Sequence, residues 1–186
     1  MCFKNSEQAE SIDDLHVVSI AALTNVAAAY LKKPESFSKI KLFWLGGGAW
    51  PTDGKKYNAM NDVEALRILL ASPIEFHWII AAGVCSKLNA SVSQSEAFVK
   101  GNGAIGEYLH QLLVDMNKGE RAIYDIGPIA AIKKQSWFTV ETAKAPSVRA
   151  DGTYQFGGEG RSISEYTDIM YSQIVDDFFQ LLGRQN

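Results

Sequence analysis

The sequence predicts an α/β protein with an open, mostly parallel sheet flanked by helices. Short apolar runs alternate with amphipathic segments, and several of the runs are rich in β-branched residues. No internal repeat of 20 to 50 residues is visible. The 186 residues suffice for one domain with a sizeable core. We expect an α/β core over residues 1–136, an irregular or β excursion over 137–168 and a carboxyl-terminal helix over 169–186.

Three buried strands are predicted in the first half of the chain, with helices between them. The predicted strands cover residues 16–21, 39–45 and 75–81. The predicted helices cover residues 25–32, which end before Pro34, and 62–71, with Asn61 as candidate N-cap. The glycine run 46–48 is expected to close the second strand, and a loop should follow it to Asn61.

Helices dominate the prediction for the second half. The spacing of Ser93 and Glu96 is that of a capping box opening a helix to about Lys100. A helix is predicted over residues 105–116, with Ile105, Leu109, Leu112 and Leu113 on one face. A helix over 125–133 should follow an extended segment. A hairpin arm is predicted at 153–156, and an amphipathic helix at 169–182.

Composition excludes several classes of protein. A net charge of −3 and a pI near 5.6 give no general attraction to nucleic acid or to anionic membranes. The longest apolar stretches are far shorter than a bilayer span. Two cysteines are too few for a disulfide framework, and the first residues lack the apolar core of a signal peptide. We therefore expect a cytoplasmic protein.

Parallel sheets place ligands at the carboxyl ends of their strands, so chemistry is sought at Thr24-Asn25, at the glycine run 46–48 and in the loop after it. The glycine run lacks the pattern of a phosphate loop, which favours a tight backbone turn beneath a ligand or a neighbouring loop. Asn58 could bind sugar hydroxyls, but an Asx turn is the favoured interpretation. Asp62 is interpreted as a helix-start carboxylate.

The remaining polar candidates are ambiguous. Asp125 lies in an apolar segment, where an N-cap role and a functional role are equally favoured. The three histidines have no partners at metal-ligand spacing and are interpreted as surface or packing residues. Trp44 and Trp78 lie in predicted strands and are interpreted as core residues, although the four tryptophans together could include a stacking platform for a base.

Four blocks in order resemble the inosine-uridine-preferring nucleoside hydrolase family, from about Ser6 to Ile132. They are Leu23-Thr24-Asn25-Val26-Ala27, Lys39 to Gly47, Tyr57-Asn58 through Asp62 to Ala65, and Tyr124-Asp125 followed by Ile129-Ala130. They are similar to the family's L-T-N-x-A, K-x-I-x-x-x-G-G, F-N-x-x-x-D-x-x-A and H-D-x-x-A blocks. The family's amino-terminal D-x-D-x-x-x-D-D motif does not occur here, so we expect a partial domain whose first strands and most calcium ligands are missing.

The resemblance implies hydrolysis of the N-glycosidic bond of ribonucleosides with a calcium-activated water. It assigns calcium to the main-chain carbonyl of Thr24 and to Asp125, and ribose to Asn58 with Tyr57 beside it. Tyr124 stands where the family has a histidine that protonates the leaving base, and Lys56 where it commonly has a glutamate near the ribose.

Two matched positions supply few of the six to eight oxygens that calcium takes. We therefore expect weak or no calcium binding and negligible nucleoside hydrolysis by this chain alone. Three hypotheses remain open: an incomplete hydrolase completed by an amino-terminal chain, a non-catalytic nucleoside- or ribose-binding protein, and a structural remnant that self-associates through an exposed sheet edge. The expected partners are a nucleoside or ribose and a second copy or complementing chain, with no nucleic acid and no membrane.

Overall fold

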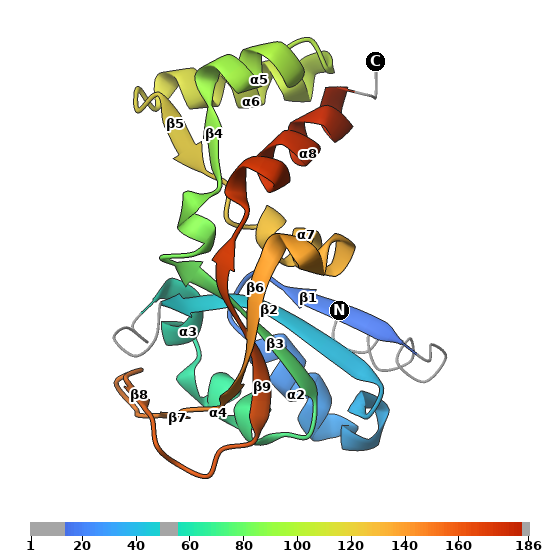
Figure 1. Ribbon diagram of the computed structural model, residues 1–186, viewed down its shortest axis with the longest axis vertical. Coiled ribbons are helices and arrows are strands. Elements are labelled where there is room, and N and C mark those ends of the chain that lie inside the picture. Colours follow the sequence, from blue (N-terminus) through green and yellow to red (C-terminus); the bar gives the residue numbers. More distant parts are fainter. Residues whose placement is uncertain (1–13, 49–55, 184–186) are drawn as a thin grey trace. The chain divides into compact units, whose positions relative to one another are not determined.

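A computed structural model describes residues 14–48 and 56–183. These residues form two compact units, shown in Figure 1. Unit 1 comprises residues 1–84 and 139–168, and unit 2 comprises residues 85–138 and 169–186. No helix among the described residues is long and apolar enough to cross a bilayer.

A five-stranded sheet forms the centre of unit 1, in the order β1-β2-β3-β9-β6. The strands are β1 (Leu15–Ser19), β2 (Ile40–Gly48), β3 (Glu75–Ala82), β6 (Phe138–Lys144) and β9 (Ser162–Ile169). Pairs β1–β2, β2–β3 and β3–β9 are parallel, which confirms the predicted α/β class with a mostly parallel sheet. The segment expected to be an irregular or β excursion thus contributes β9, a strand next to β3, and β6.

Helices and a small hairpin complete unit 1. They are α2 (Thr24–Lys32), the 3₁₀ turn η1 (Pro34–Phe37), α3 (Tyr57–Met60), α4 (Val63–Ala71) and the antiparallel pair β7 (Ser147–Val148) with β8 (Tyr154–Gln155). The hairpin confirms the predicted arm at 153–156. Asp62, and not Asn61, is the N-cap of α4, because its carboxylate accepts a hydrogen bond from the Ala65 N–H.

Large aromatic side chains fill the core of unit 1. Trp44 and Trp78 are fully buried on neighbouring strands, with ring centroids 5.1 Å apart. Both indole N–H groups donate to main-chain oxygens, Trp44 to Ala21 and Trp78 to Gly46, each at 2.9 Å. The core interpretation of these two tryptophans is therefore confirmed, and their buried polar atoms are satisfied.

The glycine run 46–48 forms the last three residues of β2, so the strand ends at the glycines as expected, although it includes them where the prediction had it end at Leu45. Its residues are buried, and a side chain at Gly46 would overlap the Trp44 ring. Glycine is favoured at Gly46 because the Trp44 ring occupies the space of a side chain, and at Gly47 because its φ is +66°.

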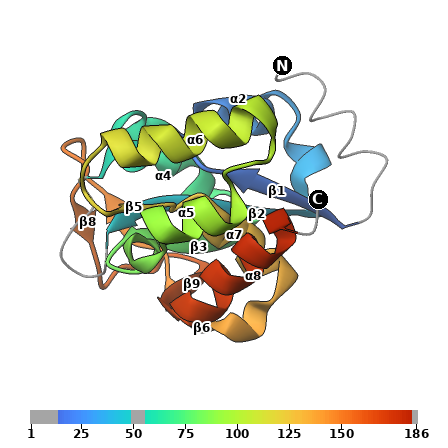
Figure 2. The same cartoon turned by 90° about the horizontal axis from the view of Figure 1, so that it is seen from above.

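Unit 2 is largely helical. Its elements are the 3₁₀ turns η2 (Cys85–Lys87) and η3 (Gln135–Trp137), the antiparallel pair β4 (Asn89–Ser91) and β5 (Glu120–Ala122), and helices α5 (Val92–Phe98), α6 (Gly103–Asp115), α7 (Ile126–Lys133) and α8 (Tyr171–Gly183). Figure 2 shows α5, α6 and α8 from above. Helix α5 packs against both α6 and α8.

Two details of unit 2 differ from the sequence prediction. The capping box is formed by Ser91 and Gln94, and not by Ser93 and Glu96, because β4 ends at Ser91 and the helix begins directly after it. On α6, Leu113 is buried, but Ile105 is 75% exposed, so the predicted apolar face is only partly covered.

Candidate functional site

The side chain of Asn58 links β2 to the main chain that directly follows β1. Its Nδ2 donates to the main-chain oxygens of Ile20 at 3.1 Å and Leu45 at 2.8 Å. Asn58 lies in α3, so the favoured Asx-turn interpretation is wrong. Its Oδ1 accepts no hydrogen bond from the residues that the structure describes. The carboxyl side of these parallel strands thus presents an amide acceptor, while the neighbouring Tyr57 is 82% exposed.

Thr24 and Asp62 form a second contact in unit 1. The Thr24 hydroxyl donates to Oδ2 of Asp62 at 2.6 Å, and Oδ1 accepts the Ala65 N–H at 2.9 Å. The hydrogen bond from Thr24, followed by that from Ala65, lowers the pKa of Asp62. This geometry confirms Asp62 as a helix-start carboxylate. Both carboxylate oxygens accept hydrogen bonds that hold the start of α4 and of α2.

We expect Asp62→Ala to lower the free energy of unfolding by about 1–2 kcal/mol, because it removes an N-cap and leaves the Thr24 hydroxyl without its acceptor. Thr24→Val is the matched variant, since it removes only the hydroxyl and should cost less. Urea denaturation of both variants measures the difference. An Asp62→Ala variant as stable as the wild type would contradict this role.

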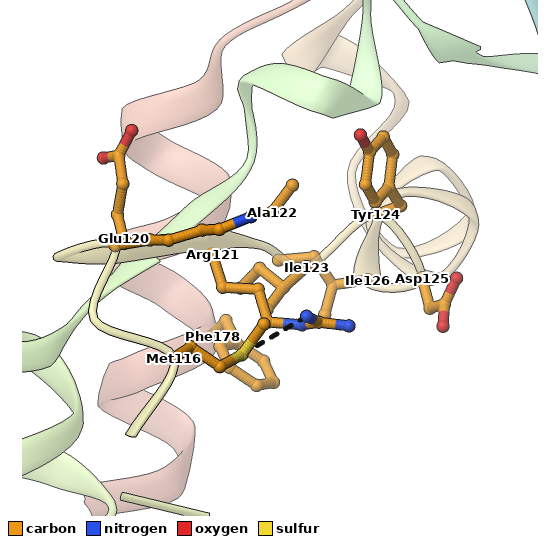
Figure 3. Close-up of a pocket in the computed structure, with 10 residues that line it drawn as sticks. Met116, Glu120, Arg121, Ala122, Ile123, Tyr124, Asp125, Ile126 and Phe178 are labelled. Carbon is orange, nitrogen blue, oxygen red and sulfur yellow. Dashed lines mark hydrogen bonds between the residues drawn. The ribbon is translucent and has the colours of Figure 1, made fainter. Parts of the chain in front are cut away.

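Tyr124 and Asp125 line a cavity of about 600 Å³ within unit 2 (Figure 3). Asp125 occupies the N-cap position of α7, but its side chain makes no capping hydrogen bond and is exposed. Other charged groups along the cavity are Lys118, Glu120 and Arg121. An uncommitted carboxylate beside a phenol and basic side chains can accept hydrogen bonds from a polar ligand.

Asp125 also affects its surroundings through its charge. Burial, and next the negative charge of Asp125, raise the pKa of the Cys85 thiol to about 12. Gly127 lies so close to Cys85 that an added Cβ would come within 2.6 Å of its sulfur. Cys85 is therefore a packed thiol and offers no nucleophile near neutral pH.

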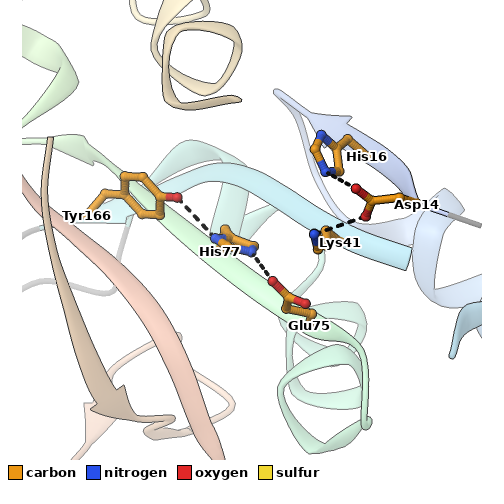
Figure 4. Close-up of polar contacts among 6 residues, drawn as sticks. All are labelled: Asp14, His16, Lys41, Glu75, His77 and Tyr166. Carbon is orange, nitrogen blue, oxygen red and sulfur yellow. Dashed lines mark hydrogen bonds and ion pairs between the residues drawn. The ribbon is translucent and has the colours of Figure 1, made fainter. Parts of the chain in front are cut away.

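Polar contacts also run along one face of the sheet in unit 1 (Figure 4). The ring of His77 lies between the Tyr166 hydroxyl, 3.1 Å from Nδ1, and Oε1 of Glu75, 2.8 Å from Nε2. Burial lowers the pKa of His77, which stacks on Phe43 with ring centroids 4.1 Å apart. The packing interpretation is confirmed for His77.

The other two histidines also have structural surroundings. His16 is exposed, and its Nε2 lies 3.6 Å from Oδ2 of Asp14. His110 is buried in unit 2, with Nδ1 2.8 Å from the Ser95 hydroxyl. Both positions agree with the interpretation of these histidines as surface or packing residues.

The described residues do not fit a calcium ion by themselves. Residues 14–48 and 56–183 include no group of three or more histidine, cysteine, aspartate or glutamate side chains that could hold a metal. Thr24 belongs to unit 1 and Asp125 to unit 2, and together they offer two oxygens where calcium takes six to eight. A calcium site at either residue needs further oxygen donors.

Of the site residues predicted from the sequence, Thr24, Tyr57 and Asn58 lie in unit 1, and Tyr124 and Asp125 lie together in unit 2. Sequence reasoning missed the hydrogen bond between Thr24 and Asp62, since the partners are 38 positions apart. It also missed Arg121, a cavity residue that carries no motif.

The fold and these positions define an α/β protein with polar groups on the carboxyl side of parallel strands. The family model described as inosine-uridine preferring nucleoside hydrolase matches residues 3–167. This chain therefore belongs to the inosine-uridine preferring nucleoside hydrolase family.

Solved structures of related fold are similar over nearly the whole chain. An inosine-uridine preferring nucleoside hydrolase from Bacillus anthracis has a TM-score of 0.79 at 19% identity, over 100% of this chain and 65% of its own. A purine-preferring ribonucleoside hydrolase from Gardnerella vaginalis has a TM-score of 0.82 at 15% identity, over 98% and 65%. The type III effector XopQ, complexed with adenosine diphosphate ribose, has a TM-score of 0.73 at 13% identity, over 98% and 64%.

At these identities the structural likeness shows the fold. The chain spans 65% of the length of the first of these structures. No curated protein matches the sequence.

Proposed function

We propose that this chain supplies part of an N-ribosyl hydrolase site and binds the ribosyl group of a ribonucleoside. The reaction class is hydrolysis of the N-glycosidic bond to ribose and a free base. The observation that carries the proposal is Asn58, whose amide nitrogen is anchored to Ile20 and Leu45 while its Oδ1 has no donor among the described residues. A fixed acceptor beside the exposed Tyr57 suits a sugar hydroxyl.

On this proposal, Asn58 and Tyr57 bind and orient the ribose, and Tyr124 donates a hydrogen bond to the leaving base in place of the family's histidine. The family resemblance assigns calcium to Asp125 and to the Thr24 carbonyl, and a cation site at either residue is completed by carboxylates from outside the described residues. Because the described residues hold no group of three metal-binding side chains, we expect the chain alone to bind calcium weakly and to hydrolyse nucleosides negligibly.

Binding and turnover are measured separately. Inosine, uridine and ribose are titrated against the full chain by calorimetry, and release of the free base is followed by absorbance. We expect saturable nucleoside binding that Tyr57→Ala weakens about 10-fold, a loss typical of one polar or stacking contact. Tyr171→Ala is the matched control, because Tyr171 is an exposed tyrosine of α8 in unit 2.

Calcium provides the second arm of the test. Only a weak calcium signal is expected, and Asp125→Asn should remove it without affecting the fold, because that side chain is exposed and makes no capping bond. Asp115→Asn is the control for a change of surface charge. A tight stoichiometric calcium site, or robust hydrolysis of inosine by the chain alone, would overturn the proposal of an incomplete site.

The same shortage of donors, with tyrosine at position 124, also favours a second candidate, a non-catalytic nucleoside- or ribose-binding protein. Coding sequence upstream of Met1 distinguishes the two. An aspartate-rich D-x-D-x-x-x-D-D segment there supports the hydrolase. Its absence, together with nucleoside binding without turnover, supports the binding protein.

A further inference from the structure

A mostly apolar groove of about 400 Å³ lies within unit 2, lined by α6 and α8. Helix α6 contributes Ile105, Leu109 and Leu112, and α8 contributes Phe178 and Leu182. The three α6 residues recur at helical spacing and remain 75%, 47% and 44% exposed. An exposed apolar stripe beside a groove of this volume is typical of a ligand-binding site.

Arg121 introduces a charge into this apolar groove. Its Nη1 donates to the thioether sulfur of Met116 at 3.4 Å, and Figure 3 shows the guanidinium beside that sulfur. A thioether is a weak acceptor. No carboxylate of the described residues lies within ion-pair distance of Arg121. The guanidinium can therefore take a carboxylate through two parallel hydrogen bonds.

The length of the groove follows from α6. Ile105 and Met116 both line it, and a helical rise of 1.5 Å per residue separates them by about 16 Å. Arg121 is on β5, next to Met116 at the end of this stretch. A ligand with one anionic end and a long apolar body matches both the charge and the length.

We propose that this groove binds a single-chain aliphatic carboxylic acid as a monomer, with the carboxylate on Arg121 and the hydrocarbon chain along α6. The site uses neither Asn58 nor Asp125, although Arg121 and Phe178 also line the cavity that contains Tyr124 and Asp125. Its chemical selectivity comes from one charged contact, and its affinity comes from apolar burial.

The test uses the full chain and palmitate below its micelle-forming concentration, with displacement of a polarity-sensitive dye as readout. We expect saturable binding of one palmitate per chain and about 10-fold weaker binding of hexadecanol, which has the same chain and no charge. Arg121→Gln should weaken palmitate binding about 10-fold and leave hexadecanol binding unchanged. Arg149→Gln is the control for loss of an exposed arginine.

A second variant tests the apolar wall. Leu109→Asp should weaken both ligands at least 10-fold, whereas Leu31→Asp, at a 60% exposed position of α2, should change neither. Circular dichroism verifies that each variant is folded. Equal affinity for palmitate and hexadecanol, or an Arg121→Gln variant that binds palmitate normally, would refute the proposal. A stable dimer that excludes palmitate and dissociates in Leu109→Asp would assign the groove to a second copy instead.

Discussion

Gly47→Ala is expected to lower the free energy of unfolding by about 3 kcal/mol or more, because strain and overlap add at one position. Gly47 has a φ of +66°, which a residue with a side chain rarely adopts. A Cβ there would collide with the Tyr154 hydroxyl and lie 3.0 Å from Cζ2 of Trp78. The rings of Trp78 and Tyr154 pack edge to face, with centroids 5.3 Å apart, so neither moves without loss of core contacts.

Urea denaturation of Gly47→Ala and Gly157→Ala separates the two causes. Gly157 also has a positive φ, +86°, but no atom lies within 4 Å of an added Cβ. Gly157→Ala should therefore lower the free energy of unfolding only through backbone strain, by about 1 kcal/mol. In a Tyr154→Phe background, Gly47→Ala should cost less than in the wild type. Equal costs for the two glycine variants would rule out the packing explanation.

The second large effect is a loss of stability at rising pH that is caused by Glu165. This carboxyl lies in β9, 5% exposed, and burial, with the charge of Glu141 on the neighbouring β6, raises its pKa from 4.5 to about 7. Between these two values the folded chain holds a proton that the unfolded chain has released. The contribution of this group to the free energy of unfolding is therefore fully present below about pH 4.5 and is lost as the pH rises through about 7.

Comparison with Glu165→Gln isolates this contribution. We expect the wild type to lose about 1–2 kcal/mol relative to Glu165→Gln between pH 4 and pH 8, after allowance for solvent screening. His77 acts in the opposite direction: burial lowers its pKa, so its contribution is lost as the pH falls below 6.5. His77 is present in both proteins, so its contribution cancels in the difference between their free energies of unfolding.

Glu141→Gln is the control for the neighbouring charge. Removing it should lower the pKa of Glu165 and narrow the pH range over which stability declines. Chemical denaturation at a series of pH values measures all three proteins. Parallel stability profiles for wild type and Glu165→Gln would show that this carboxyl has the same pKa in the folded and unfolded chains.

Much of the fold could be predicted because local pattern and tertiary packing agree. The run at 75–81 is short, β-branched and aromatic, and it forms β3 with every residue from Phe76 to Ile80 buried. Helix 62–71 was predicted within one residue, since its apolar spacing and acidic first turn are local signals. The family also followed from blocks of sequence in order, and the match over residues 3–167 confirms it.

The candidate site was less predictable because its contacts join distant parts of the chain. Asn58 reaches Leu45 and Ile20, and Thr24 reaches Asp62, pairings that no local pattern encodes. The choice of N-cap between Asn61 and Asp62 depended on where Ala65 lies relative to the carboxylate. Arg121 carries no motif, and only its position beside Met116 brings it into the groove.

The sequence by itself determined the α/β class, the first three strands of the sheet and the family, because each depends on periodicity or on short blocks of adjacent residues. Only the tertiary structure decided that the Trp44 ring packs against Gly46, that β9 lies beside β3, and that part of the apolar face of α6 remains exposed. The physical reason is that side-chain overlap, strand pairing and burial depend on residues far away in the chain, whose positions are known only after it has folded.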